Sequence, residues 1–416
     1  LHVGHWLGRP PFDPAPLASL AEELGYDSVW VSEAWGSDAV SVAAWIAVRT
    51  SRIGVGTAVL QLAARTPAAT AMTAATIDAL SGGRFRLGLG TSGPQVVEGW
   101  HGVPFDDPIG WTREYVEVVR AALRREAPLV YRGRRVRLSA EGGTGLGKPL
   151  KLGFPPLRPE VPIYLAALGP RNVALAAEVA DGWLPFLFSP EHAELFRGSL
   201  EEGFGRRGGR PEGFDVAPIA FAAAGEDLAA CRDAVRPLLA LYVGGMGSRE
   251  RNFYASLVRR YGYEREAREI QEAFLGGRRR EAVAAVPDRL VDEVALVGPV
   301  PALRETARNL ERAGADYIHV SAYTVPVPAL AGTALVPATS IAGADWPPAC
   351  FLEYAGQVKQ AVTVPVIAVG KLDDPAVAEA ALAAGSCDLV ALGRALIADP
   401  EWPHKVRQGA VPNECL

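Results

Sequence analysis

The sequence predicts a (β/α)8 barrel followed by an extra βαβα segment, an α/β fold throughout. Short apolar or β-branched runs alternate with helical stretches along most of the 416 residues. This alternation is typical of a parallel sheet. Many of the predicted strands end in Gly, Ser or Thr, which suits the rim of a barrel. We therefore expect the candidate functional residues at that rim.

The elements can be followed in chain order. Seven strands are expected by residue 224, in the segments HVGHWLG, YDSVWVSEAW, SRIGVGTAVL, GRFRLGLGTS, VPIYLAALGP, DGWLPFLF and FDVAPIAFAAA. Residues 131–160 lack a helical or strand period and are rich in Gly and Pro, so we expect a long excursion at the rim, a common position for a lid. Residues 226–312 are predicted to be helical, and DYIHVSAY supplies the eighth strand. The barrel is then complete by about residue 323, which predicts two domains, 1–323 and 324–416.

Composition narrows the class of protein. A hydrophobic content of 49% and a net charge of −5 fit a globular protein with an ample core and no footprint for nucleic acid. The four cysteines form no CxxC pair, so we expect no metal site and a reducing compartment. No apolar run is long enough for a membrane span, and the opening LHVGHWLG is too short for a signal peptide. We expect a cytoplasmic protein.

Two glycine-rich motifs invite nucleotide-binding interpretations. GLGTSG places Gly88, Gly90 and Gly93 in a G-x-G-x-x-G pattern after a strand, but no acidic residue closes a following strand as a dinucleotide site requires. A glycine-rich rim that lets backbone approach a flat cofactor is favoured instead. GGTGLGKP imitates a phosphate-binding loop, but Pro149 stands where Ser or Thr should bind magnesium. We reject the second motif.

The segment LAALGPRN is a better candidate for anion binding. A strand ends at Ala167, the chain turns through Leu168 and Gly169, and a helix is expected from about Arg171. The free N–H groups and positive end of such a helix attract anions. An ordinary strand–helix turn explains the same residues equally well.

Polar and aromatic residues cluster at other expected rim positions. Tryptophans there would sandwich a tricyclic ring, although each one fits core or lid packing as well. His101 is a candidate for proton transfer, with His5 a weaker one. The rim set comprises Glu33, Trp35, Asp38, Trp100, His101, Trp111 and Trp183.

Over residues 1 to about 305 the chain resembles the luciferase-like monooxygenases, and more narrowly their coenzyme F(420)-dependent branch. The resemblance is carried by GYDSVWVSEAWGSDA, SRIGVGTAVLQLAARTPAATAMTAATIDALSGGRFRLGLGTSGPQVVEGWHG, REYVEVVRAALRRE, PIYLAALGPRNVALAAEVADGWLP and LYVGGMGSRERNFYASLVRRYGYE. It implies a deazaflavin across the carboxyl ends of the strands and hydride transfer to or from a substrate. It also implies a non-prolyl cis peptide at Ala58–Val59 against the ring.

The same resemblance assigns further contacts. Thr91, Ser92 and Gly93 would contact the cofactor's ring or tail, and the turn Ala167, Leu168, Gly169 would take its phosphate with Arg171 nearby. The sugar-phosphate dehydrogenases of the family place a histidine where this chain has Ala34. Sugar-phosphate oxidation is therefore not expected. Glu33, Asp38 and His101 remain open alternatives for the proton-transfer group.

From about Glu305 the chain resembles the C-terminal part of the old-yellow-enzyme-type NADH:flavin oxidoreductases. The segments PVIAVGKLDDP and AALAAGSCDLVALGRALIADPEWPHKVRQG carry this resemblance. In that family two turns, each with a glycine followed by a cation, hold the phosphate of FMN. The matching residues here are Gly370, Lys371 and Gly393, Arg394. The ring contacts, the substrate-binding His/Asn or His/His pair and the proton-donating tyrosine belong to a first half that this sequence lacks.

Three hypotheses follow. The first is a deazaflavin-dependent oxidoreductase that acts on a small organic substrate by hydride transfer. The second is an FMN-dependent monooxygenase, or an ene-reductase-like flavoprotein whose tail binds FMN. The third makes the C-terminal segment a non-catalytic interaction module or a fusion remnant. We expect a homodimer, because barrels of the resembled family commonly pair.

Overall fold

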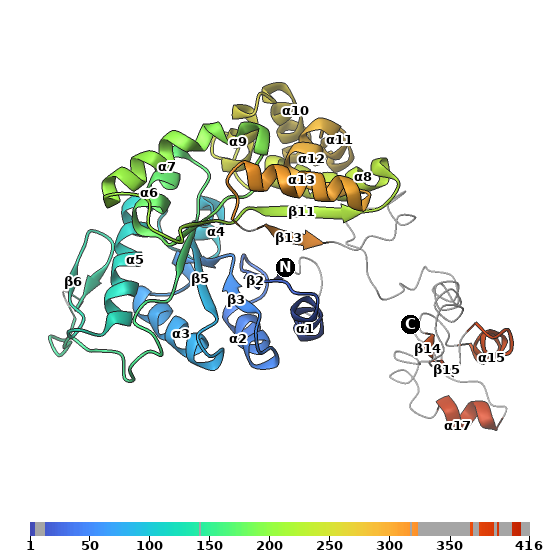
Figure 1. Cartoon of the computed structure of the whole chain (residues 1–416), viewed down its shortest axis with the longest axis horizontal. Coiled ribbons are helices and arrows are strands. Elements are labelled where there is room, and N and C mark those ends of the chain that lie inside the picture. Colours follow the sequence, from blue (N-terminus) through green and yellow to red (C-terminus); the bar gives the residue numbers. More distant parts are fainter. Residues whose placement is uncertain are drawn as a thin grey trace. The chain divides into compact units, whose positions relative to one another are not determined.

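The structure is a computed structural model that describes residues 1–4, 13–140, 143–316, 318–322, 367–368, 374–386, 389–390 and 402–408. The chain divides into two compact units, Leu1–Val327 and Pro328–Leu416, which are described separately (Figure 1).

The first unit is built on parallel strands that succeed one another in chain order. The first six are β1 (His2–Gly4), β2 (Ser28–Ser32), β3 (Gly54–Thr57), β5 (Phe85–Gly90), β8 (Ile163–Ala166) and β9 (Gly182–Leu184). Two short strands join them, β4 (Leu60–Gln61) beside β5 and β10 (Asp215–Val216) beside β9. β11 (Ile219–Ala224) meets the segment after β9 through a bridge between Phe186 and Ile219, and it pairs with β13 (His319–Ala322). β13 in turn contacts β1. The predicted (β/α)8 fold is confirmed.

Helices follow the strands. They are α1 (Ala15–Glu23), α2 (Ala39–Arg49), α3 (Pro67–Leu80), α4 (Pro94–Gly99), α5 (Pro108–Arg124), α6 (Pro170–Val179), α7 (Glu194–Arg207), α8 (Leu228–Gly245), α9 (Phe253–Arg260), α10 (Glu264–Leu275), α11 (Arg279–Ala284), α12 (Asp288–Val294) and α13 (Val300–Arg312), with 3-10 turns η1 (Leu62–Ala64) and η2 (Pro190–His192). Side-chain oxygens of Asp38, Thr66, Asp227 and Asn252 cap α2, α3, α8 and α9. Such caps satisfy backbone N–H groups that the first turn leaves free.

Bulky side chains fill the barrel interior where opposite positions are glycine. Trp30, Tyr164 and Leu184 form an inner cluster with Ala58, Ala217 and Ile219. A Cβ on Gly56 would lie 2.4 Å from the Trp30 ring, and one on Gly182 would lie 2.3 Å from the Tyr164 ring. The interior is therefore a packed core in which large and small residues are matched.

One strand interrupts the region predicted to be helical. β12 (Ala295–Gly298) lies inside residues 226–312 and pairs in parallel with the end of β11, from Phe221↔Ala295 to Ala224↔Gly298. The prediction of an entirely helical segment is wrong at this point. A four-residue apolar run between helices has too few residues to reveal its period, so strand and helix cannot be distinguished from the pattern.

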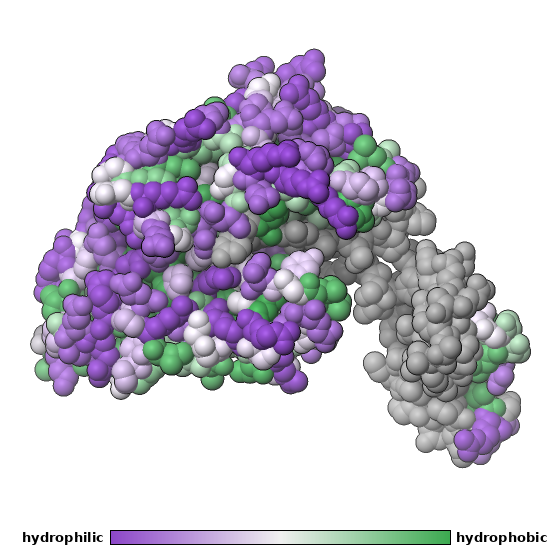
Figure 2. Space-filling view, in the orientation of Figure 1, coloured by the Kyte–Doolittle hydropathy of each residue, from purple (hydrophilic) through white to green (hydrophobic). Residues whose placement is uncertain are grey.

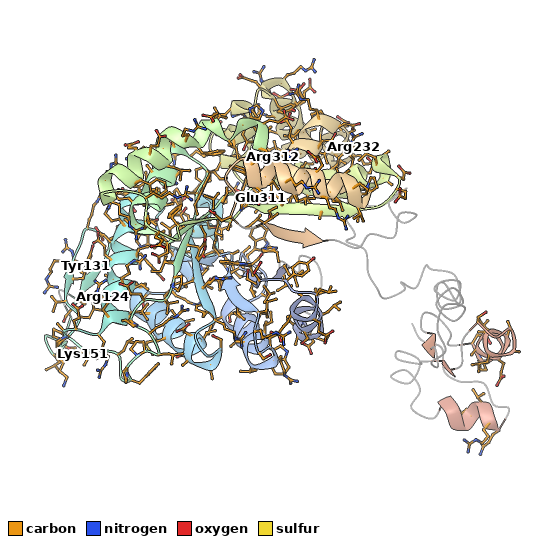
Figure 3. All side chains as sticks on the ribbon, in the orientation of Figure 1. Arg124, Tyr131, Lys151, Arg232, Glu311 and Arg312 are labelled. Carbon is orange, nitrogen blue, oxygen red and sulfur yellow. The ribbon has the colours of Figure 1, made fainter. Side chains whose placement is uncertain are left out.

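The excursion after α5 contains a two-stranded hairpin, β6 (Tyr131–Arg132) and β7 (Arg137–Leu138). The Glu114 carboxylate on α5 accepts backbone N–H bonds from Arg134, Arg135 and Val136 at 2.7 to 2.8 Å. The hairpin is thus bound to the outer side of α5. Figure 3 shows Arg124, Tyr131 and Lys151 on this same outer side.

The second unit contains a parallel pair, β14 (Ile367–Ala368) and β15 (Leu389–Val390), with helices α15 (Pro375–Ala383) and α17 (Trp402–Arg407). This order matches the predicted βαβα pattern. The predicted phosphate residues Gly370, Lys371, Gly393 and Arg394 lie outside the described residues, as does His5.

Within the described part of the chain, no helix combines the length and apolar character that a membrane crossing requires. Figure 2 shows hydrophilic residues over much of the visible face of α10 and α13.

Candidate active site at the carboxyl ends of the strands

Glu33 and Asp38, the two candidate carboxylates, meet at one arginine. Glu33 Oε2 lies 2.8 Å from Arg65 Nη1 and accepts the backbone N–H of Gln61 at 3.1 Å, while Oε1 accepts the N–H of Ala39 at 3.4 Å. Asp38 forms the second ion pair of Arg65. Both oxygens of the nearly buried Glu33 are therefore engaged.

Asp38 also has a structural task. Its Oδ2 accepts the N–H and the hydroxyl of Ser41 at 2.8 and 2.6 Å and so caps α2. Although partial burial acts in the opposite direction, these bonds and the charge of Arg65 lower the pKa of Asp38. Burial by itself would lower the pKa of Arg65, but the two carboxylates raise it. The lowered pKa favours the charged form of Asp38 over a group that exchanges protons.

The expected non-prolyl cis peptide is present between Ala58 and Val59, where the chain passes from β3 to β4. Gly90 on β5 faces this bond, because a Cβ there would lie 2.6 Å from Val59 Cγ2. Gln61 follows, and its Nε2 donates to the Ala34 carbonyl at 2.6 Å. Its Oε1 is buried and has no hydrogen-bond partner. A polar atom in this state indicates a ligand or water that completes the site.

The turn after β5 carries Thr91, Ser92 and Gly93, all partly buried. Ser92 has a φ of 60°, a left-handed conformation that is uncommon for non-glycine residues. A Cβ on Gly93 would meet no atom within 4 Å. The turn thus borders open space at the carboxyl end of the strand.

The turn after β8 has the geometry of an anion site. The indole N–H of Trp183 donates to the Ala167 carbonyl at 2.9 Å and fixes the strand end. Gly169 caps α6, and a Cβ on it would also meet nothing within 4 Å. Among the described residues, no side chain caps the first N–H groups of α6, and the exposed Arg171 lies in the same turn.

Arg260, on α9, is a residue that the sequence analysis missed. Its Nη1 lies 3.5 Å from the Leu168 carbonyl and its Nη2 donates to the Leu195 carbonyl at 3.1 Å. The guanidinium also lies 5.6 Å from the centre of the Phe196 ring. A cation is thus held beside the turn that precedes α6. Arg260 and Leu168 are 92 positions apart, and no sequence pattern connects them, so only the fold reveals that they are neighbours.

His101 lies in the loop after α4, where its backbone N–H donates to Val96 at 3.1 Å. Its Nε2 is buried without a hydrogen-bond partner. The tryptophans of the rim set differ in burial, because Trp111 and Trp183 are core residues at 7% and 1% exposure. Trp35 and Trp100 are exposed. The hypothesis of a tryptophan sandwich is not supported for the two buried rings.

The residues present fit a flat, phosphate-bearing cofactor. Open space borders Gly93 and Gly169, a helix amino end and Arg260 lie at the second turn, and Gln61 and His101 each present an unpaired buried atom. In the described part of the chain, no group of three or more His, Cys, Asp or Glu side chains is placed to bind a metal.

A polar hollow also exists at the opposite, amino ends of the strands. Its lining includes Arg86, Arg158, Asp181 and Asp215, so cations and carboxylates are mixed. None of the predicted site residues lines it. Because barrels of this kind place their chemistry at the carboxyl ends, we assign the candidate site there.

Two known protein families match this chain, one over its barrel unit and one over its C-terminal part. The luciferase-like monooxygenase family matches residues 11–340, and the NADH:flavin oxidoreductase / NADH oxidase family matches residues 303–413. A Mycobacterium tuberculosis protein named as a coenzyme F(420)-dependent oxidoreductase is 47% identical over 326 residues, which cover 77% of this chain and 94% of that protein.

Two further relatives are informative. The solved structure of the coenzyme F(420)-dependent tetrahydromethanopterin reductase from Methanopyrus kandleri is similar with a TM-score of 0.63 at 25% identity, covering 77% of this chain and 92% of that one. The NADH oxidase of Thermoanaerobacter brockii is 40% identical over 109 residues, 26% of this chain but 15% of that protein. The C-terminal part of this chain therefore corresponds to only a small part of a much longer relative.

Proposed function

The chain belongs to the luciferase-like monooxygenase family, and on this premise we propose that it is an oxidoreductase that transfers a hydride between coenzyme F(420) and a small organic substrate. The observation that carries the proposal is the turn Ala167–Gly169 before α6, with Arg260 beside it. The relative named for coenzyme F(420), at 47% identity, favours deazaflavin over FMN.

Separate parts of the site would hold separate parts of the cofactor. The amino end of α6, Arg171 and Arg260 would bind the phosphate, because backbone N–H groups and guanidinium both bind anions. Ala58 and Val59 would lie against the ring. Thr91, Ser92 and Gly93 would contact the ring or the tail of the cofactor. The deazaflavin, when bound, supplies or accepts the hydride.

His101 is our choice for the proton-transfer group. Glu33 and Asp38 are both paired with Arg65, and the lowered pKa of Asp38 disfavours a protonated acid near neutrality. His101 Nε2 is buried and lacks a partner, and an imidazole nitrogen donates or accepts a hydrogen bond according to its protonation.

The second unit is proposed to be dispensable for this chemistry. It matches an FMN-binding family over 303–413, but only as a fragment of its longer relative. Its predicted phosphate turns, Gly370–Lys371 and Gly393–Arg394, would bind no more than a phosphate, and weakly.

The proposal is tested by titrating the purified full chain separately with coenzyme F(420) and with FMN while the fluorescence of each cofactor is followed. We expect saturable binding of coenzyme F(420) and much weaker binding of FMN. Tight FMN binding without deazaflavin binding would overturn the proposal in favour of the FMN-dependent alternative.

A further inference from the structure

Four aromatic side chains gather beside the candidate site, and we call them the ring cluster: Phe186 after β9, Phe221 on β11, Tyr242 on α8 and Tyr254 on α9. The centres of Phe186 and Tyr242 lie 4.6 Å apart, and those of Tyr242 and Tyr254 lie 4.9 Å apart. Phe186 meets Phe221 and Tyr254 edge to face, at 5.4 and 5.7 Å. Figure 1 shows that α8, α9 and β11 belong to the same part of the unit.

The ring cluster and the cis peptide border the same inner cluster of the barrel. Phe186 and Val59 both pack against this inner cluster, which includes Ala58. A molecule that lies on the ring cluster would therefore share this part of the barrel with the residues that we assign to the deazaflavin ring.

A buried asparagine and two glycines fix the support of the cluster. Asn252 is 2% exposed, and its Nδ2 donates to the carbonyls of Tyr242 and Val243 at 3.0 and 2.9 Å. This joins the end of α8 to the start of α9. A Cβ on Gly244 or Gly245 would lie 2.5 or 2.1 Å from Phe274, so α8 is closely packed behind the rings. The two tyrosines are thus held in a fixed mutual orientation.

Tyr254 differs from the other buried tyrosines of this unit. Tyr115, Tyr261 and Tyr263 donate their hydroxyl hydrogens to Arg65, Leu187 and Glu293. The Tyr254 hydroxyl has no hydrogen-bond partner among the described residues, and its ring is partly buried. Burial raises the pKa of Tyr254 to about 12, so the hydroxyl stays a donor at neutral pH. A donor held in an aromatic wall without an acceptor suggests a ligand that brings one.

We propose that the ring cluster is the substrate subsite and that it selects a planar aromatic or conjugated molecule with one hydrogen-bond-accepting group, which the Tyr254 hydroxyl binds. This inference rests on the proposed function, since it names the substrate class of the same site. Edge and face contacts favour an aromatic ring over a saturated one of similar size by about fivefold in affinity.

Two ketones test the selection: acetophenone and cyclohexyl methyl ketone, which share a carbonyl and differ in ring saturation. Their dissociation constants are measured by ligand-observed NMR on the full chain, with and without coenzyme F(420). We expect acetophenone to bind about fivefold more tightly. Equal affinities, or no binding of either ketone at millimolar concentration, would overturn the inference.

Variants separate the hydroxyl from the rings. Tyr254→Phe should weaken both ketones by about fivefold, because one hydrogen bond is lost, and leave their ratio unchanged. Phe186→Leu should instead reduce the ratio. Tyr26→Phe, a change at an exposed ring lining a hollow at the opposite end of the strands, is the control and should alter neither. Unchanged ketone binding in Tyr254→Phe would contradict the assignment.

The outcome is distinguishable from that of the proposed function. If coenzyme F(420) binds the same preparation but the ketones bind equally, the subsite is wrong and the cofactor assignment stands. If ketone binding depends on Tyr254 and the preference for acetophenone on Phe186, but coenzyme F(420) does not bind, the proposed function fails and the subsite stands.

Discussion

Arg260 is the side chain on which the phosphate assignment depends most at the residue scale. Replacement by alanine removes a guanidinium that lies 3.5 Å from the Leu168 carbonyl. We expect coenzyme F(420) to bind about tenfold more weakly, since a charge-assisted hydrogen bond contributes about 1.5 to 3 kcal/mol. A fluorescence titration measures this, and Arg265→Ala, at an exposed position on α10, is the matched control. Equal weakening in both variants would point to general charge and not to this site.

Glu22 gives a pH-dependent prediction. Its carboxylate accepts the backbone N–H groups of Ser51, Arg52 and Ile53 at 3.0, 2.6 and 2.7 Å. Partial burial alone would raise its pKa, but these bonds lower the pKa of Glu22 to about 2. A depressed pKa stabilises the fold above the unfolded value of 4.5, and this stability is lost as the pH falls towards 2.

We therefore expect Glu22→Gln to lower the free energy of unfolding by about 1 kcal/mol at pH 7, after allowance for solvent screening, and by less at pH 3. Urea denaturation at both pH values measures the difference. Glu23→Gln, at the exposed neighbouring position, is the control. A loss of stability that is the same at both pH values would contradict this account.

At the scale of elements, the GLGTSG motif contains glycines with different tasks. A Cβ on Gly88 would lie 1.7 Å from the Thr57 carbonyl oxygen, whereas one on Gly93 would meet nothing within 4 Å. We expect Gly88→Ala to destabilise the fold by about 3 kcal/mol or to prevent folding, because neighbouring backbone must move. Gly93→Ala should change stability by less than about 1 kcal/mol and weaken cofactor binding. Thermal denaturation and titration of both variants decide the point, and similar melting temperatures would refute it.

The strands of the barrel were predictable from sequence because each is a buried run with a clear boundary. Ser28–Ser32 and Phe85–Gly90 are examples. β12 was not predictable, since its four residues gain their strand character only by pairing with β11. The turns at Gly93 and Gly169 stand out in the sequence itself, but only the resemblance assigns them to a cofactor, because local sequence alone does not separate an anion site from an ordinary turn. Arg260 and the ring cluster depend on contacts between distant segments, which periodicity does not encode.

At the scale of the whole molecule, we expect the barrel unit to carry the activity. Deletion of residues 324–416 should leave the affinity for coenzyme F(420) within about twofold, because the described residues that form the candidate site all precede residue 324. Circular dichroism checks the fold, and the titration checks the affinity. Loss of binding in a folded truncated chain would assign the second unit a part in the site.

The surface of α1 and α2 suggests pairing of barrel units. Leu20 and Leu24 are 49% and 67% exposed, and Trp45 and Val48 on α2 are 42% and 55% exposed. Barrels of the resembled family commonly pair, so we propose that the protein is a homodimer and that these exposed apolar side chains take part in the contact. Sedimentation equilibrium should give a dimer for the full chain and a monomer for Leu20→Glu. A wild-type monomer would refute the proposal.

The most direct test of the central claim is a crystal structure of the full chain with coenzyme F(420) bound. We expect the phosphate to lie at the amino end of α6, within hydrogen-bonding distance of Arg260, and the ring to lie against Ala58 and Val59. A phosphate bound at Gly370–Lys371 and Gly393–Arg394, or a ring away from the cis peptide, would contradict it.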